Sequence, residues 1–300
     1  MLKIAYSPIY KYELPEGHRF PMIKYELIPE QLLYEGTVTA DQFFHPDALD
    51  ESIITRTHLP SYWKKLKHLE LSRKEARAIG FPISERLVQR GRHIAQGTID
   101  CAKYALQYGI AMNVAGGTHH SFTYKGEGFC LLNDIAIAAN YLLDQQLARR
   151  ILVVDLDVHQ GNGTAEIFRT EERVFTFSMH GANNYPLRKE QSDLDIGLAD
   201  KTVDAPYLKQ LKDTLPKLLD LHRADFVFYL AGVDVLESDK LGRLSLSLQG
   251  CKARDEYVLR TCRDRQLPVA VSMGGGYSVR IADIVEAHAN TFRVAQDILG

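Results

Sequence analysis

Short apolar runs alternate along the chain with longer stretches in which apolar residues recur at helical spacing. The run Ile151–Val154, for example, carries no polar residue on either face, which is typical of a strand buried on both sides in a parallel sheet. We predict six such strands, at residues 2–6, 110–115, 151–154, 174–178, 226–231 and 268–273. Their alternation with helices predicts an α/β fold in which helices cover both faces of a parallel sheet.

The stretches between the strands predict helices, and Pro206–His222 has the clearest amphipathic pattern. We expect Pro29 to interrupt the first helix and Gly91 to break the long helical region Pro82–Tyr108, because both residue types weaken a helix interior. The stretch Ala182–Asp200 is expected to be rich in loops. Further helices are expected over residues 21–35, 49–56, 131–143, 165–168, 250–266 and 281–299.

The composition is that of an ordinary globular protein, with 300 residues, 45% hydrophobic and 25% charged. No repeat, low-complexity segment or linker divides the sequence, so we expect a single domain over residues 1–300. The net charge of −2 gives no general electrostatic case for binding nucleic acid. The locally basic stretch Trp63–Arg77 is interpreted as a solvated helix face. No stretch approaches the ~18 uncharged apolar residues of a membrane span.

The four cysteines form no C-x-x-C pair, and a chain of this size does not need a disulfide framework. The first residues, MLKIAYSPIYKYE, lack the apolar core of a signal peptide. We therefore expect a reducing, cytoplasmic location, with which a nuclear one is also compatible.

Residues with ionisable side chains follow the run Ile151–Val154. Asp155, Asp157 and His159 come at alternate positions, so their side chains point to the same side while the chain stays extended. Two neighbouring carboxylates in an apolar setting repel each other, and a bound cation relieves that cost. Asp and His are both ligands of Zn²⁺ and of other divalent ions. The stretch therefore predicts a metal site.

Three other predicted strands also end in unusual residues. His119 and His120 follow residues 110–115, Asp234 follows residues 226–231, and three glycines and Tyr277 follow residues 268–273. Ligands of open parallel sheets bind beyond the carboxyl ends of the strands. We expect these side chains to meet at one edge of the sheet, although more than 150 positions separate the first from the last.

Chemistry suggests a role for each group. Asp157, His159 and Asp234 can supply three metal ligands and leave a position for water or a substrate oxygen. The two consecutive histidines suit proton transfer, each with a partner that fixes its tautomer. Tyr277 can donate a hydrogen bond to an oxyanion. Together these features predict metal-assisted hydrolysis of a carbonyl compound.

Six motifs resemble those of the histone deacetylase superfamily, in the same order and over nearly the whole chain: GGTHHSF (116–122), GEGFCLLNDIAIA (126–138), VVDLDVHQGNGTA (153–165), TFSMH (176–180), AGVDVLESDKLGRL (231–244) and GGGY (274–277). Within the superfamily, YSPIY near the start, AGVDVLESDKLGRLSLS and KARDE (252–256) look closest to the class IV deacetylases and their bacterial relatives. The resemblance implies the arginase–deacetylase fold, with a central, mainly parallel sheet of eight strands.

The resemblance also implies a zinc-dependent amide hydrolase. The zinc ligands would be Asp157, His159 and Asp234. His120 would act as general base and acid, with His119 beside it tuning the electrostatics. Asp155 would pair with His119 and Asn162 with His120. Class I members carry Asp at the position of Asn162, so we expect His120 to be less basic here. Tyr277 would polarise the scissile carbonyl.

Further residues enter only through the resemblance. Gly128 and Phe129 would line the acyl-lysine channel, with Leu241 near its mouth, and Arg19 would lie in an internal product channel. A structural K⁺ would sit on the side chains of Asp155 and Ser178 and on the backbone carbonyls of Asp157, His159 and Met179.

The substrate stays open at this point. It could be an acyl-lysine of a protein or peptide, with an acyl group of acetyl length or longer, or a small acylated amine such as an acetylpolyamine. The rim of the pocket lies in loops whose conformation the sequence does not reveal, and neither an oligomeric state nor direct binding of nucleic acid is indicated. An inactive binding module is disfavoured because every reactive residue is present. An arginase-like dimanganese site would need another carboxylate where Asn162 stands.

Overall fold

Eight parallel strands form one sheet, in the order β2-β1-β3-β8-β7-β4-β5-β6. The computed structural model describes all of residues 1–300. The strands are β1 (Lys3–Ala5), β2 (Phe43–Phe44), β3 (Ile110–Asn113), β4 (Ile151–Asp155), β5 (Val174–Gly181), β6 (Leu194–Leu198), β7 (Phe226–Leu230) and β8 (Val269–Ser272). The predicted α/β fold with an eight-stranded sheet is confirmed, and the sheet is parallel throughout.

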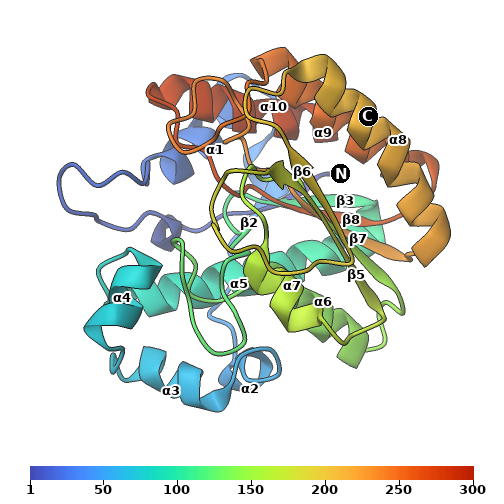
Figure 1. Cartoon of the computed structure of the whole chain (residues 1–300). Coiled ribbons are helices and arrows are strands. Elements are labelled where there is room, and N and C mark those ends of the chain that lie inside the picture. The colour runs from blue at the N-terminus through green and yellow to red at the C-terminus, as the bar shows by residue number, and fades with distance from the viewer.

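Helices cover both faces of this sheet (Figure 1). One layer holds α1 (Lys24–Tyr34), α8 (Asp204–His222), α9 (Leu248–Asp264) and α10 (Ile281–Leu299). The other holds α5 (Glu85–Tyr108), α6 (Asp134–Asp144) and α7 (Asn162–Phe168). A small lobe next to α5 and α6 contains α2 (Glu51–Ile54), α3 (Pro60–Lys67) and α4 (Arg73–Ile79). Two short 3-10 helices lie at Pro8–Tyr10 and Ala40–Gln42.

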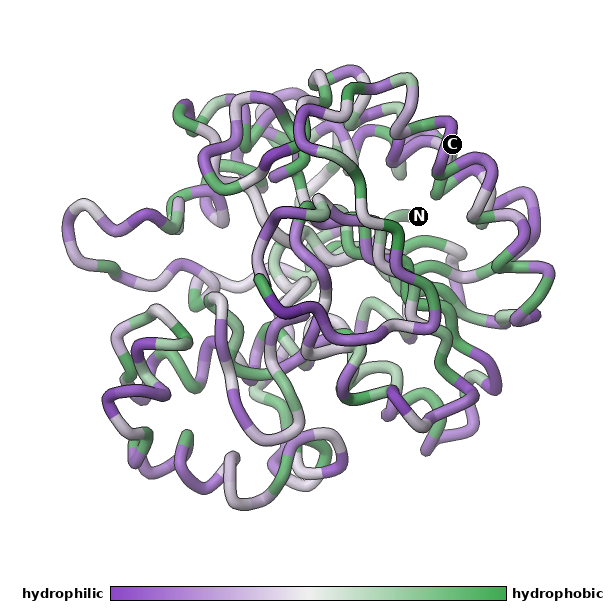
Figure 2. Tube along the Cα trace, viewed as in Figure 1, coloured by the Kyte–Doolittle hydropathy of each residue, from purple (hydrophilic) through white to green (hydrophobic).

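The core lies on both sides of the central strands, where every residue of β3, β4, β7 and β8 is buried. Figure 2 shows hydrophobic residues along the strands between the two helix layers. A single contiguous cluster of 85 buried apolar residues joins the layers, so no second core marks a domain boundary. All four cysteines are buried free thiols. No helix is both long and apolar enough to cross a lipid bilayer.

The structure differs from the sequence-based expectation at both edges of the sheet and inside two helices. β2 has only two residues, and β6 lies in the stretch expected to be loops. No residue of β6 is fully buried, so no apolar run announces this edge strand. α1 continues through Pro29, and α5 is unbroken at Gly91, which packs against Leu132. Tertiary packing outweighs intrinsic propensity at both positions.

Candidate active site

Four neighbouring strands bring the reactive residues to one edge of the sheet. β3, β8, β7 and β4 are adjacent in the strand order, and their carboxyl ends point the same way because all pairs are parallel. The ends of these strands and the segments that follow them carry the polar residues that we call the site floor: His119, His120, Asp155, Asp157, His159, Asn162, Asp234 and Tyr277. All of these side chains are buried, and the expected convergence is therefore found.

Asp157, His159 and Asp234 form a compact group of possible metal ligands. Their ligand atoms all lie within 4.8 Å of one another. His159 Nδ1 is 3.0 Å from Asp157 Oδ1 and 3.1 Å from Asp234 Oδ2. The backbone N–H of Val158 donates to Asp234 at 2.9 Å, and that of Gly275 donates to Asp157 at 2.8 Å. These bonds orient both carboxylates towards the imidazole.

The protonation of this group indicates that a cation fits between its members. Burial disfavours a charge on His159, but Asp157 and Asp234 outweigh burial and raise the pKa of His159 to about 10. Burial and the charge of Asp157 raise the pKa of Asp234 to about 7. The imidazolium thus supplies the positive charge that two buried carboxylates need. A divalent cation would replace that proton, since metal ligands bind in their deprotonated forms.

Glycine is required where the loop after β8 approaches the carboxylates. A Cβ added to Gly275 would lie 2.0 Å from an oxygen of Asp234 and 2.8 Å from one of Asp157. Any side chain would therefore displace the carboxylates, and only glycine lets the backbone N–H reach Asp157. The triple glycine that precedes Tyr277 is thus part of the ligand environment.

A buried arginine ties together the loops after β4 and β7, which carry the ligand group. Arg254 Nη1 donates to the carbonyl oxygens of Leu156, at 3.1 Å, and Gly232, at 2.6 Å. Its other bonds go to the carboxylate of Asp255, and both side chains are fully buried. The residue belongs to the KARDE motif in α9, for which sequence reasoning gave no role.

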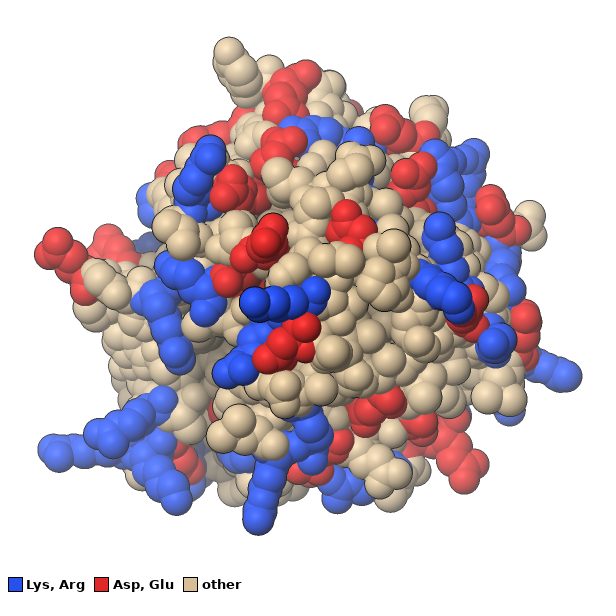
Figure 3. All heavy atoms as spheres, turned by 45° about the horizontal axis from the view of Figure 1, so that its top comes forward, with Lys and Arg blue, Asp and Glu red and all other residues tan.

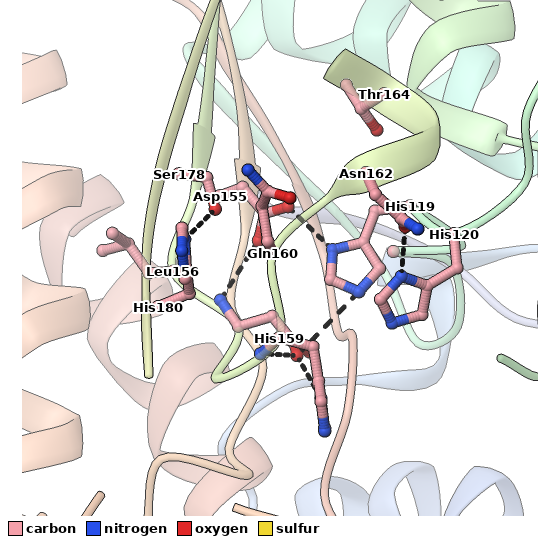
Figure 4. Close-up of polar contacts among 12 residues, drawn as sticks. His119, His120, Asp155, Leu156, His159, Gln160, Asn162, Thr164, Ser178 and His180 are labelled. Atoms are coloured by element: carbon pink, nitrogen blue, oxygen red, sulfur yellow. Dashed lines mark hydrogen bonds and ion pairs between the residues drawn. The ribbon is translucent and has the colours of Figure 1, made fainter. Parts of the chain in front are cut away.

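The two adjacent histidines have different partners (Figure 4). His119 Nδ1 is 2.7 Å from Asp155 Oδ2, and His120 Nδ1 is 2.7 Å from Asn162 Oδ1, so the structure has both expected pairings. Burial opposes a charge on His119, yet the nearby carboxylates of Asp155 and Asp157 outweigh burial and raise its pKa. Burial, helped by the charges of His119 and His159, lowers the pKa of His120 well below its usual value.

The carboxylate of Glu127 contacts the amide nitrogen of Asn162, while the amide oxygen contacts His120. Asn162 Nδ2 donates to Glu127 Oε1 at 2.8 Å, and Glu127 also accepts from Tyr185 Oη at 2.7 Å and Lys125 Nζ at 2.8 Å. Burial opposes ionisation, but these three donors outweigh it and lower the pKa of Glu127. The Asn162 oxygen is therefore turned towards His120, which donates through Nδ1 and keeps Nε2 free to accept a proton.

Glu127 lies inside the GEGF motif, but sequence reasoning did not assign it a contact. Tyr185 was also missed, and its ring makes an edge contact with His120, with the ring centroids 5.0 Å apart. Tyr185 comes from the loop before β6, whose conformation no sequence pattern specified.

Tyr277 is available as a hydrogen-bond donor. Burial, followed by the negative charges of Asp234 and Asp157, raises the pKa of its hydroxyl well above the usual value. Its backbone N–H donates to Asp239 Oδ2 at 2.6 Å, which anchors the loop after β8 to the loop after β7. The ring centroid lies 6.4 Å from that of His159. A protonated hydroxyl therefore stands next to the ligand group.

An outer pocket of about 220 Å³ leads to the site floor. Its lining residues are Arg19, Ala78, His120, Gly128, Phe129, His159, Tyr185, Leu241 and Tyr277. Gly128, Phe129 and Leu241 thus line this pocket, and their role in a substrate channel stays a prediction. The backbone N–H groups of Gly128 and Phe129 bind the carbonyls of Ala78 and Ile79, at 3.0 and 2.7 Å. These bonds hold Phe129 in a left-handed conformation (φ 68°) that is uncommon for a non-glycine residue.

Arg19 was expected in an internal product channel, but the structure places it at the outer pocket. Its guanidinium carbon lies 5.0 Å from the centroid of the Phe129 ring, and the residue lines the outer pocket. A smaller inner cavity of about 40 Å³ lies behind the site and is lined by Arg90 of α5 instead. Arg90 is buried and donates through Nε to the carbonyl of Tyr10 at 2.7 Å. The loop that carries Arg19 has no periodic sequence pattern, so the direction of the Arg19 side chain could not be predicted.

The residues expected around K⁺ lie at the carboxyl end of β4, in the loop that follows it and in β5. Asp155 and Ser178 face each other in the register of this strand pair, and Met179 follows in β5. Ser178 Oγ lies 2.9 Å from His180 Nδ1 (Figure 4), a contact that sequence reasoning missed. Asp155 also accepts the backbone N–H of Asp157 at 3.2 Å. The K⁺ site stays a prediction.

Comparisons with known proteins agree with the fold and the motifs. The family model described as histone deacetylase domain matches residues 18–292. The chain is 44% identical over 295 residues to an uncharacterized protein of Picosynechococcus, covering 98% of each chain. It is 28% identical to histone deacetylase 2 of Arabidopsis thaliana, over 95% of this chain and 78% of the relative. It is 26% identical to the acetoin utilization protein AcuC of Staphylococcus xylosus, over 91% and 77%.

A solved structure has the same fold. The crystal structure of an HDAC homolog complexed with SAHA superposes on the chain with a TM-score of 0.84 at 21% identity, covering 99% of this chain and 88% of that one. This likeness establishes the shared fold, and the matched family model spans most of the sequence. The chain therefore belongs to the histone deacetylase family.

Proposed function

We propose that the protein is a zinc-dependent amide hydrolase that removes acyl groups from the lysine side-chain amine of proteins or peptides. One observation carries the proposal: three buried ligand atoms within 4.8 Å of one another adjoin a tyrosine hydroxyl and a histidine base at the end of one pocket. Membership of a deacetylase family supports a hydrolase. The zinc ion, the acyl-lysine substrate and the class IV assignment are the finer parts of the proposal.

Each residue of the site floor then has a task. Zn²⁺ on Asp157, His159 and Asp234 would polarise the acyl carbonyl and make water a stronger nucleophile. Tyr277 donates its hydrogen bond to the carbonyl oxygen as negative charge develops there. His120 accepts the proton of the attacking water at Nε2 and later gives it to the leaving amine. The products are a carboxylate and a free amine.

Two supporting roles complete the site. Asp155 holds the ring of His119, whose raised pKa favours the imidazolium form beside the reacting centre. Asn162 holds His120 in the tautomer that leaves Nε2 free. The residues at the ends of β4 and β5 would bind a structural K⁺, which would fix the strand ends that carry the ligands.

A substrate panel with metal removal tests the proposal. We expect the zinc-loaded protein to hydrolyse acetyl- to myristoyl-lysine peptides, a chelator to abolish this hydrolysis, and added Zn²⁺ to restore it. Acetylspermidine in the same panel distinguishes a small-amine hydrolase. Hydrolysis of acetylspermidine alone would replace the proposed substrate class, and hydrolysis that a chelator leaves intact would remove the metal from the proposal.

A further inference from the structure

The outer pocket has an uncompensated positive charge at its mouth. Arg19 is exposed, lines the pocket and lies over the ring of Phe129. No carboxylate lies within 4.0 Å of its guanidinium, and it makes no hydrogen bond within the protein. Because the guanidinium lies over the aromatic ring and has no polar partner in the protein, its N–H groups stay free for a ligand.

Two other exposed cations are direct chain neighbours of residues that line this pocket. Arg77 precedes the lining residue Ala78, and Lys240 precedes the lining residue Leu241. Both side chains are exposed and neither belongs to an ion pair. We call Arg19, Arg77 and Lys240 the cationic rim. On the molecular face drawn in Figure 3, Lys and Arg side chains gather at the lower left, and side chains of both charges are interspersed over the rest.

The carboxylates nearest to this rim are already engaged. Glu127 precedes the lining residue Gly128, but it accepts hydrogen bonds from Lys125, Asn162 and Tyr185. Asp239 lies two positions before Leu241 and accepts three backbone N–H groups. Glu16 and Glu237 are exposed in the same loops, but neither lines the pocket nor adjoins a lining residue. Lys125 offsets the charge of Glu127 in an ion pair, so the three rim cations outnumber the one remaining carboxylate, Asp239, although the chain as a whole carries −2.

We infer that the cationic rim selects acyl-lysines that lie in acidic protein segments. Carboxylates one or two residues from the modified lysine would pair with Arg19, while a cationic amine or a basic segment would meet like charge. The inference rests on the proposed function and narrows its substrate class. It also disfavours acetylpolyamines, whose remaining amines are positively charged.

Peptides that differ only in flanking charge test this inference. We expect the zinc-loaded protein to have a kcat/KM about tenfold higher for an acyl-lysine peptide flanked by Asp than for the same peptide flanked by Lys, the size of a few exposed ion pairs. The preference should shrink as salt is raised from 0.05 to about 0.5 M. Arg19→Glu should abolish most of it, because Arg19 is the rim cation that lines the pocket and a carboxylate there would repel the acidic peptide.

Lys217→Glu is the matched control. Lys217 is an exposed, unpaired cation of α8, which lies on the opposite side of the molecule from α4 (Figure 1). This variant should keep the preference of the wild type. An equal rate for both peptides, faster hydrolysis of the basic one, or an equal change in Lys217→Glu would overturn the inference. Tighter competition by single-stranded RNA than by an acidic peptide of equal charge would overturn it as well.

Direct binding separates this inference from the proposed function. Fluorescence anisotropy of labelled peptides on the slow Tyr277→Phe variant reports the charge preference without turnover. Tighter binding of the acidic peptide, with no hydrolysis of any peptide by the wild type, would refute the proposed function and keep the selective rim. Equal binding of both peptides would refute the rim, whatever the activity.

Discussion

The site floor and the cationic rim are built on opposite principles. On the floor, carboxylates and histidines are buried at strand ends and each bonds to a named partner, as in the pairs His119–Asp155 and His120–Asn162. On the rim, Arg19 and Lys240 are exposed on loops, Arg77 is exposed in the last turn of α4, and none of the three has an ion-pair partner. The difference indicates that the sheet determines which reaction is possible, while the loops determine which molecules enter. Substitutions on the two levels should therefore affect different kinetic quantities.

The largest effect is expected from Tyr277→Phe on the floor. Loss of one hydroxyl that donates to the developing oxyanion should lower kcat by about 10²–10³ with little change in KM. Metal content, measured by atomic absorption, should match that of the wild type because Tyr277 is not a ligand. Turnover within a factor of two of the wild type would exclude Tyr277 from the reaction and weaken the contrast with the rim.

The second largest effect is expected from Arg254, which holds the loops that carry the metal ligands but is not itself part of the site floor. Arg254→Met removes the bonds to the Leu156 and Gly232 carbonyls. Zinc affinity, measured by competition with a fluorescent chelator, should fall about 10- to 100-fold. Arg254→Lys should recover part of it.

Arg260→Met, on the exposed side of the same helix, is the control for Arg254. It should bind zinc like the wild type. Arg254→Met also leaves Asp255 without its cation, so the melting temperature must be measured in parallel. A lower melting temperature with unchanged zinc affinity would mean that Arg254 stabilises the fold but does not position the ligands.

The smallest effect is expected from Glu127→Gln, which lies between floor and rim. Its negative charge reaches His120 through the Asn162 amide and favours the imidazolium form. Its removal should lower the pKa of His120, so the acid limb of kcat/KM should move to lower pH. We expect kcat/KM to fall about three- to tenfold, since a less basic histidine is a weaker general base.

Glu16→Gln is the comparison for this variant, because Glu16 is exposed and does not contact the asparagine. Its pH profile should match that of the wild type. An acid limb that moves to higher pH in Glu127→Gln, or moves equally in both variants, would contradict the relay through Asn162.

The floor could be predicted from the sequence because its residues follow apolar strands. A run such as Ile151–Val154 fixes where the strand ends, and the parallel sheet then brings Asp157, Asp234 and Tyr277 together. The partner Glu127 could not be predicted, because its bond to Asn162 depends on two loops. The direction of Arg19 and the position of Tyr185 are unpredictable for the same reason. Edge strand β6 alternates half-buried and exposed residues and therefore lacks a continuous apolar run.

The strand order has a consequence for how the protein becomes active. β8 lies between β3 and β7, and no strand of the group β2-β1-β3 pairs with any strand of the group β7-β4-β5-β6. β8, the last strand of the sheet in chain order, is therefore the strand that hydrogen-bonds to both groups. In a nascent chain that has not yet released β8, no strand pairing sets the position of His120 relative to the metal ligands of the other group. Catalytic competence should consequently appear late in synthesis, as a single step that reports completion of the whole sheet.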